Sequence, residues 1–109
     1  MSDLEKIELS IDEAKSKITK AEMLSRLIKT EDWKKVIEDG YFVEEASNVV
    51  LLKSTPGFSD DNNQKQLLKQ IDAIGAFRQY LSSVFQVAEM ARKSLEEFED
   101  VKTEILSEE

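Results

Sequence analysis

Residues 4–28 read LEKIELSIDEAKSKITKAEMLSRLI, and this stretch decides the fold. Steps of three and four residues through it reach eight positions, of which seven are apolar: Leu4, Ile7, Ile11, Ala14, Ile18, Ala21, Ser25 and Ile28. Charged residues such as Glu8, Asp12 and Lys15 fall between these positions. A narrow apolar stripe of this kind is typical of a helix that packs against another helix. We name these eight positions the first seam.

A second apolar stripe, the second seam, lies towards the other end of the chain. It comprises Val84, Ala88, Ala91, Leu95, Phe98, Lys102 and Ile105, of which only Lys102 is polar. Residues 60–107 contain one Gly and no Pro, and their apolar residues keep helical spacing, so we predict one long helix there. At ~1.5 Å per residue this helix is about 70 Å long. A small core cannot cover that length, so the excess must find a partner or stay in solvent.

The seams are joined by residues 30–58, for which we predict a connector of short helices. Thr30 can cap a new helical turn, so we expect a break or kink near it. Gly40 suits the position just after a helix, where the backbone often becomes left-handed and a missing Cβ removes the steric cost. Residues 41–53 contain strand formers, but their spacing also fits a helix, which we favour. Residues 54–60, which include Pro56, predict a loop.

These elements predict an all-α fold, a helical hairpin or coiled-coil-like bundle. It has two long helices, 1–29 and 60–107, and a short aromatic connector, within one domain that spans 1–109. The simplest arrangement lays the first seam antiparallel against the second, with residues 33–58 packed over residues 71–80. Gly75 then admits a close ring such as Trp33 or Phe42. A heptad stripe specifies burial but not which copy supplies the partner, so the seams pair either within one chain or between chains.

The composition excludes much of catalytic chemistry. The 109 residues include no Cys and no His, which removes thiolate and imidazole metal sites, cysteine nucleophiles and histidine acid–base catalysis. Three isolated glycines cannot form a phosphate-binding loop. Asp60 and Asp61 lack the ligand order of a calcium loop, so we interpret them as helix caps. We therefore expect no enzyme activity, cofactor or metal; an enzyme that uses carboxylates is the weakest of three function classes.

The net charge of −8 argues against direct nucleic-acid binding, because binding to phosphates requires clustered Lys and Arg. Residues 96–109 hold seven acidic residues and one Lys, so most of the negative charge is terminal. This end is either a solvated helix terminus or an electrostatic surface for a basic partner. No run approaches ~18 apolar residues, and the first residues are acidic, so we expect no membrane association and no cleaved leader.

Two blocks resemble small helical proteins encoded by tailed bacteriophages. The first is DGYFVEEA at residues 39–46, followed by Val49-Val50-Leu51-Leu52, and the second is QIDAIGAFRQYL at residues 70–81. The resemblance covers roughly residues 32–95 and leaves the first seam and the acidic end unaccounted for. It implies a viral source, and with it a location in the host cytoplasm or in a virion. It carries no established activity.

The seams indicate a function in protein association. We expect a non-enzymatic helical interaction or assembly factor of a bacteriophage, which self-associates or binds a protein partner. The residues expected to carry binding are apolar seam positions at both ends of the chain: Leu4, Ile7, Ile11, Ile18, Leu95 and Phe98. The alternative is an acidic phage inhibitor that occupies a basic, nucleic-acid-binding site on a host protein.

Overall fold

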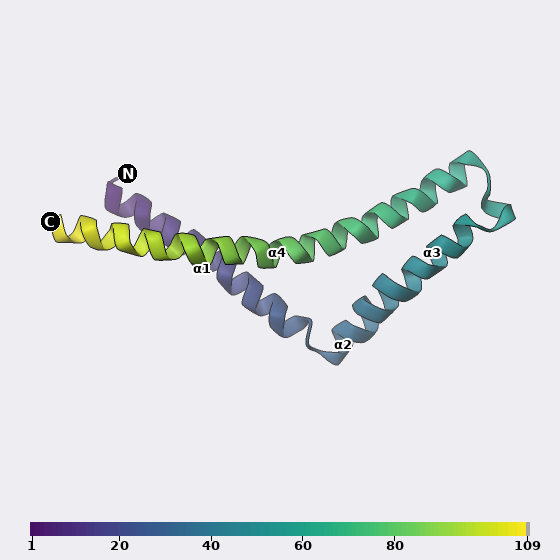
Figure 1. The fold of residues 1–109 in the computed structure, drawn as a ribbon, viewed down its shortest axis with the longest axis horizontal. Helices are drawn as coiled ribbons and strands as arrows, with labels where there is room; N and C mark the ends of the chain where they lie inside the picture. The colour runs from purple at the N-terminus through teal and green to yellow at the C-terminus, as the bar shows by residue number, and fades with distance from the viewer. Residues whose placement is uncertain (109) are drawn as a thin grey trace. The chain divides into compact units, whose positions relative to one another are not determined.

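The computed structural model describes residues 1–108, and these residues are helical almost throughout (Figure 1). The elements in chain order are α1 (Asp3–Leu27), α2 (Glu31–Trp33), η1 (Lys34–Glu45), α3 (Ala46–Lys53), η2 (Pro56–Phe58) and α4 (Asp61–Glu108). No strand occurs in this part of the chain, and the predicted all-α class is confirmed.

The chain divides into two compact units. Unit 1 contains Met1–Ser25, which is most of α1, together with the second part of α4 from Ser82 onward. Unit 2 contains Arg26–Leu81, with the three consecutive elements α2, η1 and α3 and the first part of α4. The helix α4 therefore contributes its first part to unit 2 and its second part to unit 1.

The first helix begins and ends at side-chain caps. At its start the Glu5 backbone N–H donates to the Ser2 hydroxyl over 3.1 Å, and that hydroxyl donates to the Glu5 carboxylate, also at 3.1 Å. These two contacts link the residue pair that forms a capping box. After α1 the Thr30 hydroxyl donates to the Leu27 carbonyl at 2.8 Å and accepts from the Trp33 N–H at 3.1 Å. The predicted break near Thr30 is confirmed.

The next helix runs without interruption from α2 through η1 to α3, and its middle part is a π-helix. At the end of η1 the Ala46 N–H still donates to the Tyr41 carbonyl, five residues back. Gly40 lies inside η1, and no glycine within residues 1–108 has a positive φ. The prediction that Gly40 ends a helix in a left-handed conformation is therefore wrong, whereas the preference for helix over strand at residues 41–53 is confirmed.

The spacing of the apolar residues explains the π-helix. Trp33, Ile37, Phe42 and Ala46 are separated by steps of four and five residues, and all four are partly buried. An α-helix, with ~3.6 residues per turn, would move charged Glu44 towards this face instead. A π-helix closes i→i+5 hydrogen bonds and holds more residues per turn, so it keeps the four apolar residues in line.

The aromatic residues of this helix gather on Phe77 of α4. Ring centroids of Trp33, Tyr41 and Phe42 lie 6.4, 5.9 and 5.7 Å from that of Phe77. The Arg78 guanidinium lies 5.4 Å from the centre of the Phe42 ring, at cation–π distance. The predicted packing of the aromatic connector over residues 71–80 is found here.

Aliphatic side chains complete the core of unit 2, and Gly75 does not contribute to it. Val49 is only 1% exposed, and Leu67 and Ile74 of α4 are also buried. Gly75 is exposed, and a Cβ built on it has no neighbour within 4 Å. The expectation that a ring approaches Gly75 closely is therefore wrong, because the rings pack on Phe77, two residues further along α4.

The loop between α3 and α4 is fixed by two polar side chains. The Gln64 amide nitrogen donates to the carbonyls of Lys53, at 3.1 Å, and Phe58, at 2.7 Å. Asp60 caps α4, because its carboxylate accepts from the backbone N–H of Asn63 at 3.1 Å and from the Asn63 side chain at 2.6 Å. The backbone N–H of Asn63 in particular lowers the pKa of Asp60 below its ordinary value of 3.8. The predicted capping role of this residue is confirmed.

Candidate functional site

In unit 1 the first seam, as far as Ser25, faces the second seam. Within this unit α1 and α4 run in opposite directions, so the start of α1 lies beside the end of α4 (Figure 1). Ala21 of the first seam packs with Val84 and Ala88 of the second, and Ala88 has no exposed surface. Nearer the chain ends an ion pair joins Glu8 to Lys102 over 3.5 Å.

The contact between these helices covers the residues that the sequence predicts for partner binding. Ile11 is only 6% exposed. The other five are partly buried: Leu4, Ile7, Ile18, Leu95 and Phe98. Their inner surfaces stabilise the helix pair within one chain, so an external partner reaches only their outer edges.

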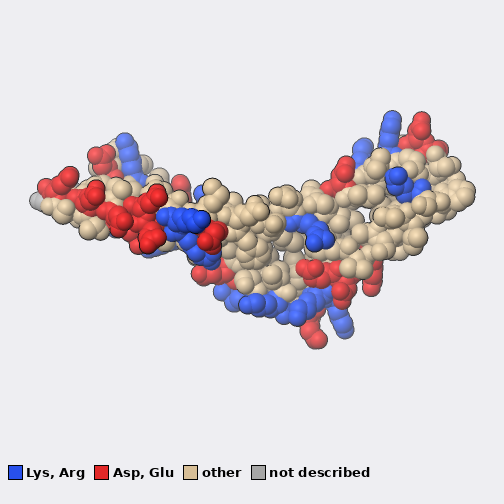
Figure 2. Space-filling model, in the orientation of Figure 1, with Lys and Arg blue, Asp and Glu red and all other residues tan. Residues whose placement is uncertain are grey.

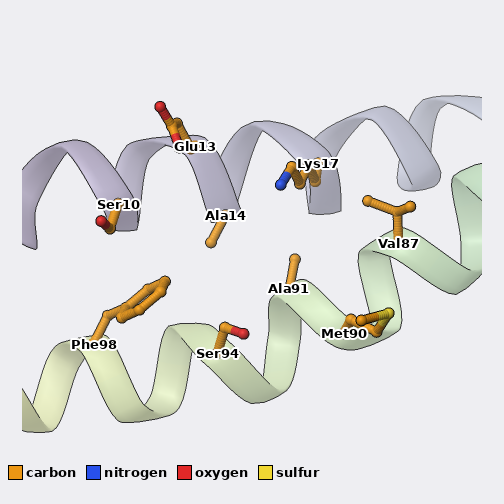
Figure 3. A pocket seen from close by; sticks show the side chains of 9 residues that line it. All are labelled: Ser10, Glu13, Ala14, Lys17, Val87, Met90, Ala91, Ser94 and Phe98. Carbon is orange, nitrogen blue, oxygen red and sulfur yellow. The ribbon is translucent and has the colours of Figure 1, made fainter.

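Small side chains at the helix contact leave a hollow on one side of it. Ala14 and Ala91 point towards each other, and Ser10 and Ser94 lie beside them with the ring of Phe98 (Figure 3). The hollow measures about 340 Å³ and is completed by Glu13, Lys17, Val87 and Met90. Because no large side chain fills this position, the outer surface of unit 1 is concave here.

A second hollow continues the first towards the chain ends. It measures about 390 Å³ and is lined by Asp3, Lys6, Ile7, Ser10, Val101 and Ile105. Ser10 lines both hollows, so they form one shallow surface along the two helices. We name the residues that line the two hollows the α1–α4 groove.

Apolar side chains of α4 stand exposed along this groove. Met90 is 68% exposed, and Val87 and Val101 are each 42% exposed. The seams do not predict Met90, Val87 and Val101, because each lies beside a seam position and not in it. The sequence does contain a pattern that groups two of them. Val87, Ser94 and Val101 are seven residues apart, so they lie on one side of the helix.

Charge is distributed unevenly around the groove. Residues 1–10 and 95–108, which lie level with each other, carry nine acidic and two basic side chains. The acidic ones are Asp3, Glu5, Glu8, Glu96, Glu97, Glu99, Asp100, Glu104 and Glu108, and the basic ones are Lys6 and Lys102. Residues 11–25 and 82–94 carry five basic and four acidic side chains. Figure 2 shows the acidic groups at the end of unit 1 that holds the C-terminus.

Unit 2 also exposes apolar side chains on the helix formed by α2, η1 and α3. They are Val36, Val43, Val50 and Leu51. A shallow hollow of about 410 Å³ lies beside Ala46, Val50 and Leu51.

Among residues 1–108, no three acidic side chains lie where they could hold a metal ion together, and no buried side-chain nitrogen or oxygen lacks a hydrogen bond. No helix in the same range is long and apolar enough to cross a lipid bilayer. No protein-family model, curated protein sequence or solved structure matches the chain.

Proposed function

We propose that this protein is a non-enzymatic helical interaction or assembly factor that binds its partner through the α1–α4 groove. The observation that carries the proposal is the exposure of Met90, Val87 and Val101 beside two continuous hollows. Burial of one such side chain contributes roughly 1.5–3 kcal/mol before entropic costs, whereas an exposed ion pair contributes about 0–1 kcal/mol. Apolar contact in the groove is therefore the main source of affinity.

The seams have a structural part in this proposal. We propose that they form a helical hairpin with coiled-coil-like packing, which presents the groove as a rigid surface. The facing alanines allow α1 and α4 to approach closely, and the larger seam residues exclude water on both sides of them. The resemblance of residues 39–46 and 70–81 to small phage proteins implies a viral source, and for such a protein we propose a role in particle assembly, in the host cytoplasm or in the virion.

Site-specific photo-crosslinking in cells that produce the full chain tests the proposal. A photoreactive amino acid replaces Met90 in one variant and Met23 in a second. Met23 is a matched control because it is 57% exposed on α1 and lines neither hollow. We expect a discrete protein adduct from position 90 and none from position 23. Absence of an adduct at position 90, or equal adducts at both positions, contradicts the proposal.

A second candidate function is an acidic inhibitor that occupies a basic, nucleic-acid-binding site. The gathering of carboxylates at one end of unit 1 favours it (Figure 2). Replacement of the exposed Glu97, Glu104 and Glu108 by Gln removes charge without removing seam residues. If this function holds, the triple variant loses partner binding and the wild-type affinity falls steeply with salt. Retained binding in the triple variant contradicts it.

A further inference from the structure

We infer that the occupant of the α1–α4 groove is the same groove of a second copy of this chain, in the antiparallel orientation. The inference rests on the proposed function and names its partner. Three features of unit 1 support it: the size of the groove face, the position of Met90 relative to the hollow, and the distribution of charge between the two ends.

The size of the face fits a pair of helices better than a single helix. Residues 3–25 span about 33 Å at ~1.5 Å per residue, and two adjacent helices of ~10 Å diameter are about 20 Å across. Each copy then buries roughly 700 Å², or roughly 1,400 Å² for both, which lies within the ~1,200–2,000 Å² of specific protein interfaces. A lone helix in the groove covers about half of this area and falls below that range.

The shape of the groove is complementary to itself. Met90 projects from α4, and one helical turn further along α4 the surface is low, because Ser10 and Ser94 line the hollow there (Figure 3). In a two-fold interface a contact from residue i to residue j occurs twice. An axis that crosses α4 between positions 90 and 94 places each Met90 on the serine-lined hollow of the other copy. The unbranched Met side chain adapts readily to such a surface.

The charges select the antiparallel orientation. This orientation lays the acidic end of one copy, residues 1–10 and 95–108, over residues 16–25 and 82–89 of its partner, where two basic and two acidic side chains balance. A parallel two-fold arrangement would stack the two acidic ends on each other. Charge complementarity mainly sets the orientation and the specificity of an interface, and apolar contact sets its strength. The same axis brings the two Glu13 side chains near each other, which weakens the dimer.

Sedimentation equilibrium of the intact chain tests the stoichiometry. We expect twice the monomer mass of 12.5 kDa for the wild type and for Met23→Glu. Met90→Glu is expected to raise the dimer dissociation constant at least a hundredfold, and Glu13→Gln to lower it. Circular dichroism controls for folding, and because Met90 is exposed we expect an unchanged helix content. A monomeric wild type, a Met90→Glu dimer of unchanged strength or a weakened Glu13→Gln dimer overturns the inference.

Spin labels on a cysteine placed at Glu104 test the orientation. The chain has no Cys, so this substitution gives a single labelling position. In the antiparallel dimer the labels lie about 35 Å apart, because twelve residues at ~1.5 Å each separate position 104 from the axis in each copy. A distance below about 20 Å indicates the parallel arrangement and overturns the inference. If the chain is monomeric and position 90 still crosslinks to another protein in cells, this inference fails and the proposed function stands.

Discussion

Replacement of Gly40 by Ala tests the π-helix of unit 2, with Gly75→Ala as its matched control. In an ordinary exposed helix position, Ala is more stable than Gly by about 1 kcal/mol. Gly75 is such a position, since a Cβ there has no neighbour within 4 Å. A Cβ at Gly40 lies 3.0 Å from the carbonyl oxygen of Lys35, five residues back. In a π-helix the Lys35 carbonyl is the acceptor for the backbone N–H five residues further on, at Gly40. A shift of this carbonyl away from the new Cβ would therefore lengthen that hydrogen bond.

The expected magnitude follows from these two environments. We expect Gly75→Ala to stabilise unit 2 by about 1 kcal/mol. Gly40→Ala is expected to be less favourable than Gly75→Ala by about 1–3 kcal/mol, the usual cost of inserting a methyl group into occupied space. Both substitutions lie in unit 2, so they are compared within the same part of the fold.

Urea unfolding followed by circular dichroism measures the two changes against the wild type. A difference of 1 kcal/mol corresponds to a shift of roughly 4–8 °C in the Tm of a small domain, so thermal unfolding gives an independent value. If Gly40→Ala stabilises the protein as much as Gly75→Ala does, the helix at Gly40 is an ordinary α-helix. The argument from the spacing of the apolar residues would then be refuted.

Three further predictions concern the caps and the loop of unit 2. Thr30→Ala should destabilise the protein by about 1 kcal/mol in urea unfolding, because Trp33 loses its hydrogen-bond acceptor, whereas Thr30→Ser should be nearly neutral; equal losses would contradict the cap. Gln64→Glu places a carboxylate against two carbonyl oxygens and should cost about 1–3 kcal/mol, so an unchanged urea midpoint would contradict this anchor. The lowered pKa of Asp60 means that its carboxylate stabilises the fold fully above pH 3.8 and progressively less as pH falls through the lowered pKa. The Tm of the wild type should therefore fall towards that of Asp60→Asn at acidic pH, and parallel pH profiles would show that the Asn63 contact contributes nothing.

Local patterns in the sequence predicted most of the secondary structure. The long run without Pro predicted one helix at 60–107, and α4 occupies Asp61–Glu108. The stripe of the first seam predicted a helix at 1–29, and α1 occupies Asp3–Leu27. A period of ~3.6 residues does not predict the π-helix, because Trp33, Ile37 and Phe42 follow a longer period. The same period of ~3.6 residues places Gly40 at a helix end, whereas it lies inside η1.

The candidate site was less predictable than the helices. Leu4, Ile11 and Phe98 were selected as partner-binding residues because a seam must be covered, but a stripe does not say what covers it. The seams do not predict an exposed role for Met90, which lies at the rim of the groove. Its side chain is exposed because it does not point towards α1, where the two helices pack together.

The sequence alone determined that the chain is helical, where its long helices start and stop, and which chemistry its residue types exclude. Those properties depend on caps, on breakers and on periodicity within a few residues of each position. Only the tertiary structure decided that the seams face each other within one chain and that alanines and serines leave a groove beside them. The burial of a side chain and the shape of the surface depend on contacts between segments that are distant in the sequence. The residue pattern of one helix does not specify which side chains of another helix lie against it.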